Sequence, residues 1–144
     1  MRRPAGRRFS ANEKEIDYIL QENTQWKRNI SDTASEMEFL KQFLEADVFQ
    51  TNIPNLYEHL QEFFEELESL KEEQLELVRE TQHHGHNIDG MLECEDISCE
   101  VFYHEEHLLL HHRVMKFLEK FASFRLSVFS YCGQKLRQRR DQDQ

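Results

Sequence analysis

Glycine and proline are scarce in this 144-residue chain, which contains 4 Gly and 2 Pro. Because these residues interrupt helices and form tight turns, their scarcity leaves little room for sheets, hairpins or long loops. No apolar run approaches the roughly 20 residues of a membrane-spanning helix. The Arg-rich start also lacks the apolar core of a signal peptide. We therefore expect a helical protein with neither a membrane span nor a secretion signal.

Cysteine is also rare, and its three positions are Cys94, Cys99 and Cys132. Their odd number does not suggest a disulfide framework, and Cys94 and Cys99 lack the spacing of common structural zinc sites. Free thiols of this kind are typical of a reducing compartment. We therefore place the protein in the cytoplasm.

Both ends of the chain carry a net positive charge, although the net charge of the whole chain is −10. Four arginines lie among the first eight residues, and a second group of basic residues begins at Lys135. The acidic body between them should repel nucleic acids and anionic membranes, so we expect neither as a partner. We interpret residues 1–9 and 135–144 as charged, flexible tails.

Three stretches repeat apolar residues in alternating steps of three and four, which keeps each stripe on one side of a long coiled-coil-like helix. The first stripe is Ile16, Ile19, Asn23, Trp26, Ile30, Thr33, Met37, Leu40 and Leu44. The second is Ile53, Leu56, Leu60, Phe63, Leu67, Leu70, Gln74, Leu77 and Thr81. The third is Tyr103, His107, Leu110, Val114, Phe117, Phe121, Phe124, Val128 and Tyr131.

These stripes predict an all-α fold with a single domain over residues 10–134 and helices at about 10–47, 54–84 and 96–134. The segment from Ser10 to Glu13 resembles a capping box at the start of the first helix. Bends are expected near Gln50 and Asn87. Because both connections are short, consecutive helices should pack antiparallel, in an up-down-up three-helix bundle. Folding about Asn87 would bring Phe63 near Phe117.

The same register predicts that Trp26, Gln74 and His107 meet in one buried polar layer. Buried amide and imidazole groups need hydrogen-bond partners, and this layer would supply them. Two interpretations stay open at this point. The layer either fixes the register of the bundle, as single polar core residues do in coiled coils, or forms a buried functional site.

The third helix carries a second apolar row beside its main stripe, and a three-helix monomer does not readily bury both rows. Apolar surface of this kind is commonly covered by another copy or by a partner helix. We therefore predict a non-enzymatic interaction or scaffold protein that forms a homo-oligomer or binds a helical partner. The predicted contact residues are Leu108, Met115, Leu118, Ala122 and Phe129.

An alternative hypothesis is a metal-binding bundle that holds zinc or iron near the second bend. Imidazole and thiolate ligands suit such metals, and His107 and His111 have a spacing that can chelate from successive helical turns. The candidate ligands are His83, His84, Cys99, His104, His107 and His111. The glutamate of a zincin motif is missing after His107, and we find none of the common phosphate-loop or nucleophile motifs.

Overall fold

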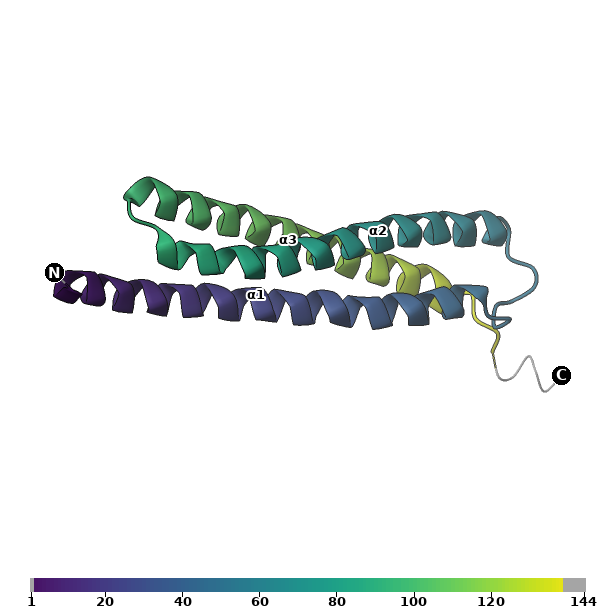
Figure 1. Ribbon diagram of the computed structural model, residues 1–144. Coiled ribbons are helices and arrows are strands. Elements are labelled where there is room, and N and C mark those ends of the chain that lie inside the picture. Colours follow the sequence, from purple (N-terminus) through teal and green to yellow (C-terminus); the bar gives the residue numbers. More distant parts are fainter. Residues whose placement is uncertain (1, 139–144) are drawn as a thin grey trace.

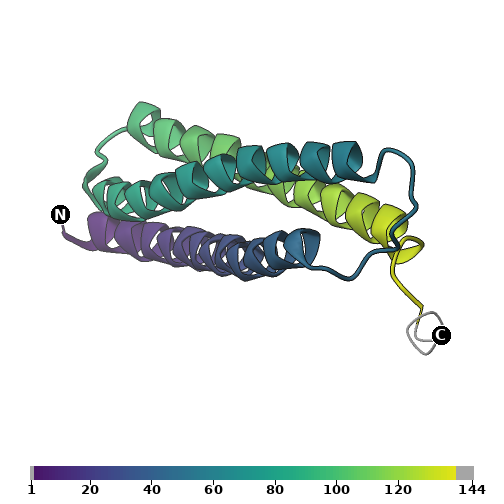
Figure 2. The same ribbon diagram turned by 90° about the vertical axis from the view of Figure 1, so that its right-hand side faces the viewer.

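The computed structural model describes the backbone of residues 2–138 and the side chains of residues 13–138. Helix α1 spans Arg2–Glu45, α2 spans Leu56–Ile88, the short 3-10 helix η1 spans Asp89–Glu93, and α3 spans Ile97–Gly133. In Figure 1, α2 returns along α1, and α3 reverses again and crosses α2. Figure 2 shows the same three rods, with the start of α1 and the end of α3 at opposite ends of the molecule. The predicted all-α three-helix fold is confirmed.

The start of α1 differs from the prediction, because the helix begins at Arg2 and not at Ser10. Arginine and alanine are strong helix formers, and they dominate the first residues. Pro4 lies in the first turn, where its missing N–H would have had no acceptor within the helix. The backbone of residues 2–9 is therefore helical, which corrects the predicted tail boundary. The capping-box sequence lies inside α1.

The first connection ends at Asn55, so the second helix starts two residues later than predicted. Asn55 has φ 60° and ψ 20°, a left-handed conformation that asparagine tolerates better than most residues. Helix α2 then begins at Leu56. The residue type at this turn is thus matched to its backbone conformation.

The second connection begins later than predicted, because α2 continues through Gly85 as far as Ile88. A Cβ atom at Gly85 would lie 3.2 Å from Asn23 Nδ2, so the missing side chain lets α1 approach α2 closely here. Helix α3 starts after Asp96, whose carboxylate accepts a hydrogen bond from the Cys99 amide at 2.9 Å. Asp96 therefore caps the N-terminus of α3, close to the predicted start at about residue 96.

The later reversal shifts the register between α2 and α3. Phe63 contacts Phe124, with ring centroids 6.1 Å apart, and not Phe117 as predicted. Phe124 lies seven residues further along α3. Since α2 runs past Gly85 and η1 follows it, the chain reverses beyond Asn87. Phe63 also contacts Tyr131, with ring centroids 5.9 Å apart. The stripes of α2 and α3 therefore face each other as predicted, but Phe63 meets residues that lie seven to fourteen positions further along α3 than predicted.

Most residues of the three stripes form the core, and every position of the first stripe is buried. In the other two stripes the partly exposed positions are Ile53, Leu56, Phe63, Tyr103 and Tyr131. A large cluster along the bundle includes Ile30, Phe117 and Phe121. A smaller cluster near the second connection contains Ile16, Ile19, Ile88, Met91 and Cys94. Burial of each large side chain contributes roughly 1.5–3 kcal/mol before ordering entropy is subtracted.

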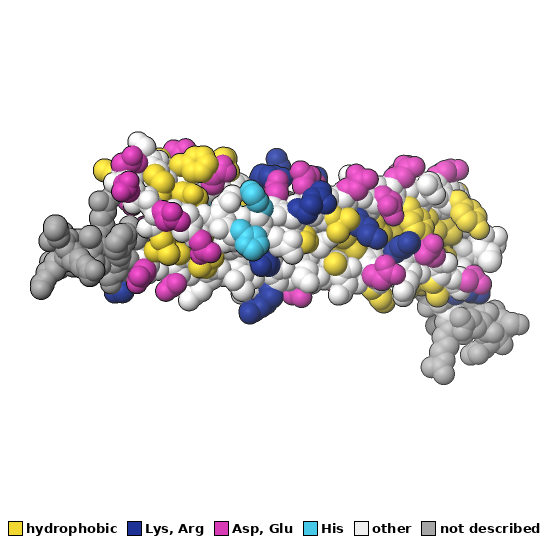
Figure 3. All heavy atoms as spheres, in the orientation of Figure 1, with side chains coloured by type: hydrophobic (Ala, Val, Ile, Leu, Met, Phe, Trp, Pro, Cys, Tyr) yellow, Lys and Arg dark blue, Asp and Glu magenta, His cyan; other side chains and the backbone are white. Residues whose placement is uncertain are grey.

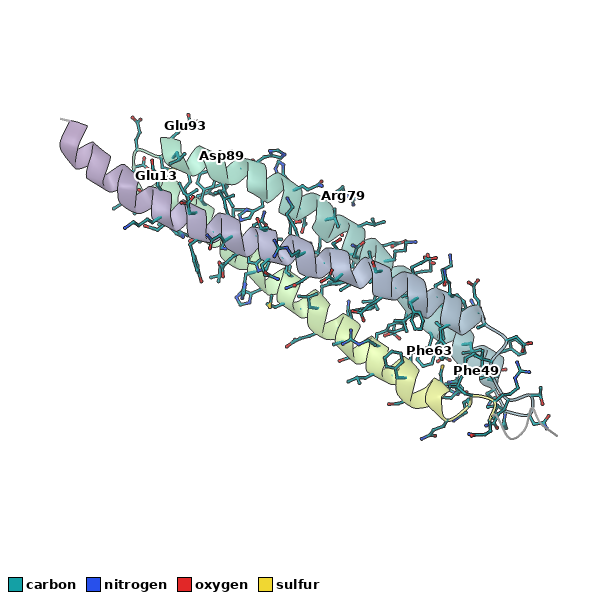
Figure 4. The ribbon with its side chains drawn as sticks, turned by 90° about the horizontal axis from the view of Figure 1, so that it is seen from below. Glu13, Phe49, Phe63, Arg79, Asp89 and Glu93 are labelled. Atoms are coloured by element: carbon teal, nitrogen blue, oxygen red, sulfur yellow. A yellow bond between two sulfur atoms is a disulfide. The ribbon has the colours of Figure 1, made fainter. Side chains whose placement is uncertain are left out.

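The segment after α3 pairs with the first connection. The Gln50 amide donates to the Lys135 carbonyl and the Arg137 amide donates to the Val48 carbonyl, both at 2.8 Å. Phe49, beside these bonds, is buried, and Figure 4 shows it close to Phe63 at this end of the bundle. Residues 135–137 are thus tied to the bundle. The rest of the predicted C-terminal tail, residues 139–144, lies outside the described residues.

Cys94 and Cys99 form a disulfide, which contradicts the prediction of free thiols. The turn between η1 and α3 brings their Cα atoms to 5.5 Å, within the range that a disulfide requires. Cys132 is a free, buried cysteine, and burial raises the pKa of its thiol to about 11. The cysteines therefore do not indicate a reducing compartment, and the cytoplasmic location stays a prediction.

Candidate interaction surface and buried histidines

Helix α3 exposes more large apolar side chains than α1 or α2 among the described residues. These side chains are Ile97, Val101, Phe102, Leu108, Leu109, Leu126 and Phe129. Ile97 is 74% exposed and Leu108 is 56% exposed. On the face drawn in Figure 3, hydrophobic side chains gather toward both ends of the rod, while histidine and basic residues occupy the middle. This protein therefore exposes apolar side chains on α3 in addition to those buried in its core.

Five apolar residues of α3 recur at intervals of seven and form a line that we call the outer seam. Its members are Val101, Leu108, Met115, Ala122 and Phe129. Val101, Leu108 and Phe129 are exposed, and Met115 and Ala122 are partly exposed. The outer seam lies about 100° around α3 from the buried positions His107, Val114, Phe121 and Val128. It forms a second apolar line on the same helix, and Met115 at its centre also packs partly against the main core cluster.

The predicted contact residues occupy two kinds of position. Four of them, all but Leu118, belong to the outer seam. Leu118 is partly buried and packs against the main core cluster, as does Met115. Sequence reasoning missed Val101, although its position seven residues before Leu108 was the available signal.

Ion pairs between α1 and α3 border the outer seam on one flank. The Arg125 guanidinium donates to Glu36 at 2.7 Å, and His104 Nε2 lies 3.1 Å from a Glu15 carboxylate oxygen. On the other flank, His112 and Glu119 are exposed. The seam is thus an apolar line with polar margins, which is the pattern of a protein-binding surface.

A buried polar chain links all three helices near mid-length. His84 Nε2 and His107 Nδ1 lie 2.8 Å apart, and His107 Nε2 lies 2.7 Å from Glu22 Oε1. An ionised carboxylate only accepts, so we assign the donor role to His107 Nε2, which leaves its Nδ1 to accept from His84. The ring of Trp26 stacks on His107, with centroids 4.6 Å apart. We call Glu22, His107 and His84 the histidine chain.

Burial keeps His84 neutral in this arrangement. Desolvation is the largest cause, and the charges of His107 and His83 act in the same direction, so that the pKa of His84 falls from 6.5 to about 4. The histidine chain is therefore more stable with His84 neutral than with a positive charge on both imidazole rings.

The structure places the three residues of the predicted polar layer in two separate arrangements. All three are buried, and Trp26 lies against His107. Gln74 donates instead to the Ile30 carbonyl at 3.2 Å, one helical turn further along α1. The place expected for Gln74 beside His107 is taken by His84, because of the register shift between α2 and α3.

The candidate metal ligands are not gathered into one site. Cys99 is bonded to Cys94 and has no thiolate to offer. His104 pairs with Glu15, and His111 packs against Trp26 with centroids 5.6 Å apart. His83 is exposed. Within residues 13–138, no group of three or more His, Cys, Asp or Glu side chains has an arrangement that would hold a metal ion.

A groove of about 610 Å³ lies between α2 and α3 beside the histidine chain. Phe102, Leu109 and His84 contribute to its lining. Arg113 spans part of the gap and forms an ion pair with Glu80. The groove exposes apolar side chains next to charged ones, but its paired charges do not define one class of ligand.

Comparisons with protein-family models, with curated proteins and with solved structures found no match. Among the described residues, no helix combines the length and the apolar character needed to cross a bilayer. A functional hypothesis for this chain therefore depends on the arrangement of its own side chains.

Proposed function

We propose that this protein is a helical interaction module that binds a second copy of itself or a partner helix through the outer seam of α3. The observation that carries this proposal is a seven-residue apolar repeat on the solvent side of a helix whose other stripe is already buried. Such a repeat places one apolar side chain every two helical turns along the same side of α3, about 10.5 Å apart. The proposal involves no catalysis.

The energetics favour an occupied seam. An exposed apolar line stays in contact with water in a monomer, and its burial would gain about 25 cal/mol for each Å² removed from water. Contiguous apolar surface of this kind marks interaction sites more often than single exposed leucines do. The polar flanks would then stay hydrated at the rim of the contact.

The proposal is tested by Leu108→Glu, with Tyr57→Glu as the matched control. Both substitutions replace an exposed apolar residue by the same charge, and Tyr57 is 86% exposed on α2, away from the seam. Leu108 suits this test better than Leu118, which packs against the core. Circular dichroism should show that both variants keep the helical content of the unchanged protein.

The measurements are molar mass by light scattering and capture of proteins from an extract of the native host. We expect Leu108→Glu to weaken self-association, or capture of the same partner, by about tenfold or more, because it places a charge in an apolar contact. Tyr57→Glu should leave both unchanged. Equal behaviour of the two variants would show that the seam is not the interface.

A further inference from the structure

The outer seam is nearly symmetric about its central residue. Met115 has Leu108 and Ala122 at seven residues on either side, and Val101 and Phe129 at fourteen. A contact between two identical chains with twofold symmetry must be self-complementary, so that each residue i that meets residue j is matched by j meeting i. A helix that packs antiparallel on its own copy meets this condition when its contact line is centred on one residue.

We infer that a second copy of this chain packs its α3 antiparallel on the outer seam, with Met115 on the twofold axis. This inference rests on the proposed function and names the partner. In this arrangement Leu108 meets Ala122 of the second copy, and Val101 meets Phe129 of the second copy. Each of these layers combines a larger side chain with a smaller one, so the layers have similar volumes, as close packing requires.

A parallel arrangement would not fill the seam evenly. Identical residues would face each other in every layer, so that Ala122 would meet Ala122 and Phe129 would meet Phe129. The first layer would be underfilled and the second would be crowded, and both faults destabilise an apolar contact. The order of residue sizes along the seam therefore favours the antiparallel dimer.

The polar residues on the solvent flank agree with this orientation. His112 follows Leu108 by four residues and Glu119 follows Met115 by four, so both lie on the same side of the seam. A twofold axis perpendicular to both helices keeps that side facing itself. His112 then lies next to Glu119 of the second copy, and the symmetry repeats this pair. The seam from Val101 to Phe129 would extend for about 42 Å, at 1.5 Å per residue.

Two single-cysteine additions test the pairing. Leu108→Cys and Ala122→Cys are purified separately, checked for helical content, and oxidised mildly either alone or as a mixture. The natural cysteines give little background, because Cys94 and Cys99 are already bonded and Cys132 is buried. We expect a disulfide-linked dimer in the mixture that contains one chain of each variant, with at least about tenfold more product than either variant gives alone.

The outcomes separate this inference from the proposed function. Strong cross-linking of Leu108→Cys or Ala122→Cys alone would indicate a parallel contact and overturn the antiparallel dimer. The absence of any cross-link, together with a monomeric mass for the unchanged protein, would also overturn it. If Leu108→Glu then still abolished capture of a different protein, the proposed function would stand without the dimer. If Leu108→Glu changed neither mass nor capture, both would fail.

Discussion

His84 and His107 share a single hydrogen bond between α2 and α3, with Nε2 of the first 2.8 Å from Nδ1 of the second. The ring of Trp26 stacks on His107, and Glu22 from α1 accepts a hydrogen bond from His107 Nε2. Two imidazolium rings cannot share such a bond, because both facing nitrogens would then carry a proton. The bundle is thus most stable when at least one of the two rings is neutral.

This arrangement predicts a loss of stability in acid that depends on His84. Its pKa is about 4 in the folded protein and 6.5 is the ordinary value, so the folded state favours the neutral ring. The stabilisation is fully present above pH 6.5 and is lost as the pH falls from 6.5 toward 4. Between pH 7 and pH 4, the unchanged protein should lose about 1–3 kcal/mol more unfolding free energy than His84→Gln does.

Urea denaturation at each pH, followed by circular dichroism, measures this difference. Glutamine keeps a hydrogen-bond donor for His107 but does not titrate, so the comparison isolates the protonation of His84. His86→Gln, at an exposed position away from the outer seam and its flanks, is the control and should retain the pH dependence of the unchanged protein. Identical pH profiles for His84→Gln and the unchanged protein would contradict the prediction.

A second prediction concerns the glycine at the second connection. A Cβ atom at Gly90 would lie 2.5 Å from the hydroxyl oxygen of Tyr103, whereas one at Gly133 would meet nothing within 4 Å. Gly90→Ala should therefore lower the unfolding free energy by about 1–2 kcal/mol, because Tyr103 must move, and Gly133→Ala should change it much less. Adding Tyr103→Phe to Gly90→Ala should recover part of the loss. Thermal or urea unfolding of these three variants and of the unchanged protein measures the differences in unfolding free energy. Equal stability of the two single alanine variants would contradict the prediction.

The disulfide gives a third prediction, which thiol counting tests directly. Protein unfolded without reductant should expose one reactive thiol, that of Cys132, and three after reduction. Reduction should also lower the unfolding free energy by about 1–3 kcal/mol, since a closed loop restricts the unfolded chain. Hydrogen exchange should quicken first in η1 and in the first turn of α3. Three thiols in freshly isolated protein would show that the bond is not formed.

A fourth prediction follows from the inferred dimer and concerns its charges. Glu119→Lys removes the carboxylate that faces His112 of the second copy, and His112→Glu places two carboxylates together. Each change should weaken self-association by about 2–30-fold, since exposed polar pairs contribute about 0.2–1 kcal/mol and the dimer contains two. The double variant restores opposite charges and should recover the affinity. Sedimentation at low salt measures this, and strictly additive losses in the double variant would contradict the predicted contact.

The fold was predictable because a seven-residue apolar repeat is a local property of the sequence. Each stripe can be identified without knowledge of the other two, and burial of residues such as Ile30, Leu70 and Phe117 follows from it. The exposed seam of α3 was visible in the same way. Positions such as Val101 and Leu108 differ from the core positions only by their phase along the helix.

The phase between helices was not predictable, because it depends on where each helix ends. Gly85 is a plausible stop signal, and glycine costs a helix about 1 kcal/mol. Continuation of α2 instead buries Ile88 and, through η1, Met91 in the smaller core cluster. Burial of two large side chains outweighs the cost of one glycine. The partners of Gln74, His84 and His107 all follow from that choice.

The pairing of residues 135–137 with residues 48–50 has a mechanical consequence. It fixes the point at which the chain leaves the bundle, at the pole opposite the start of α1. Helix α1 alone, with its 44 residues, measures about 66 Å. Probes attached near Glu13 and Arg137 would therefore report a long and nearly constant distance between the two ends of the bundle. Groups linked to these two ends would be held well apart.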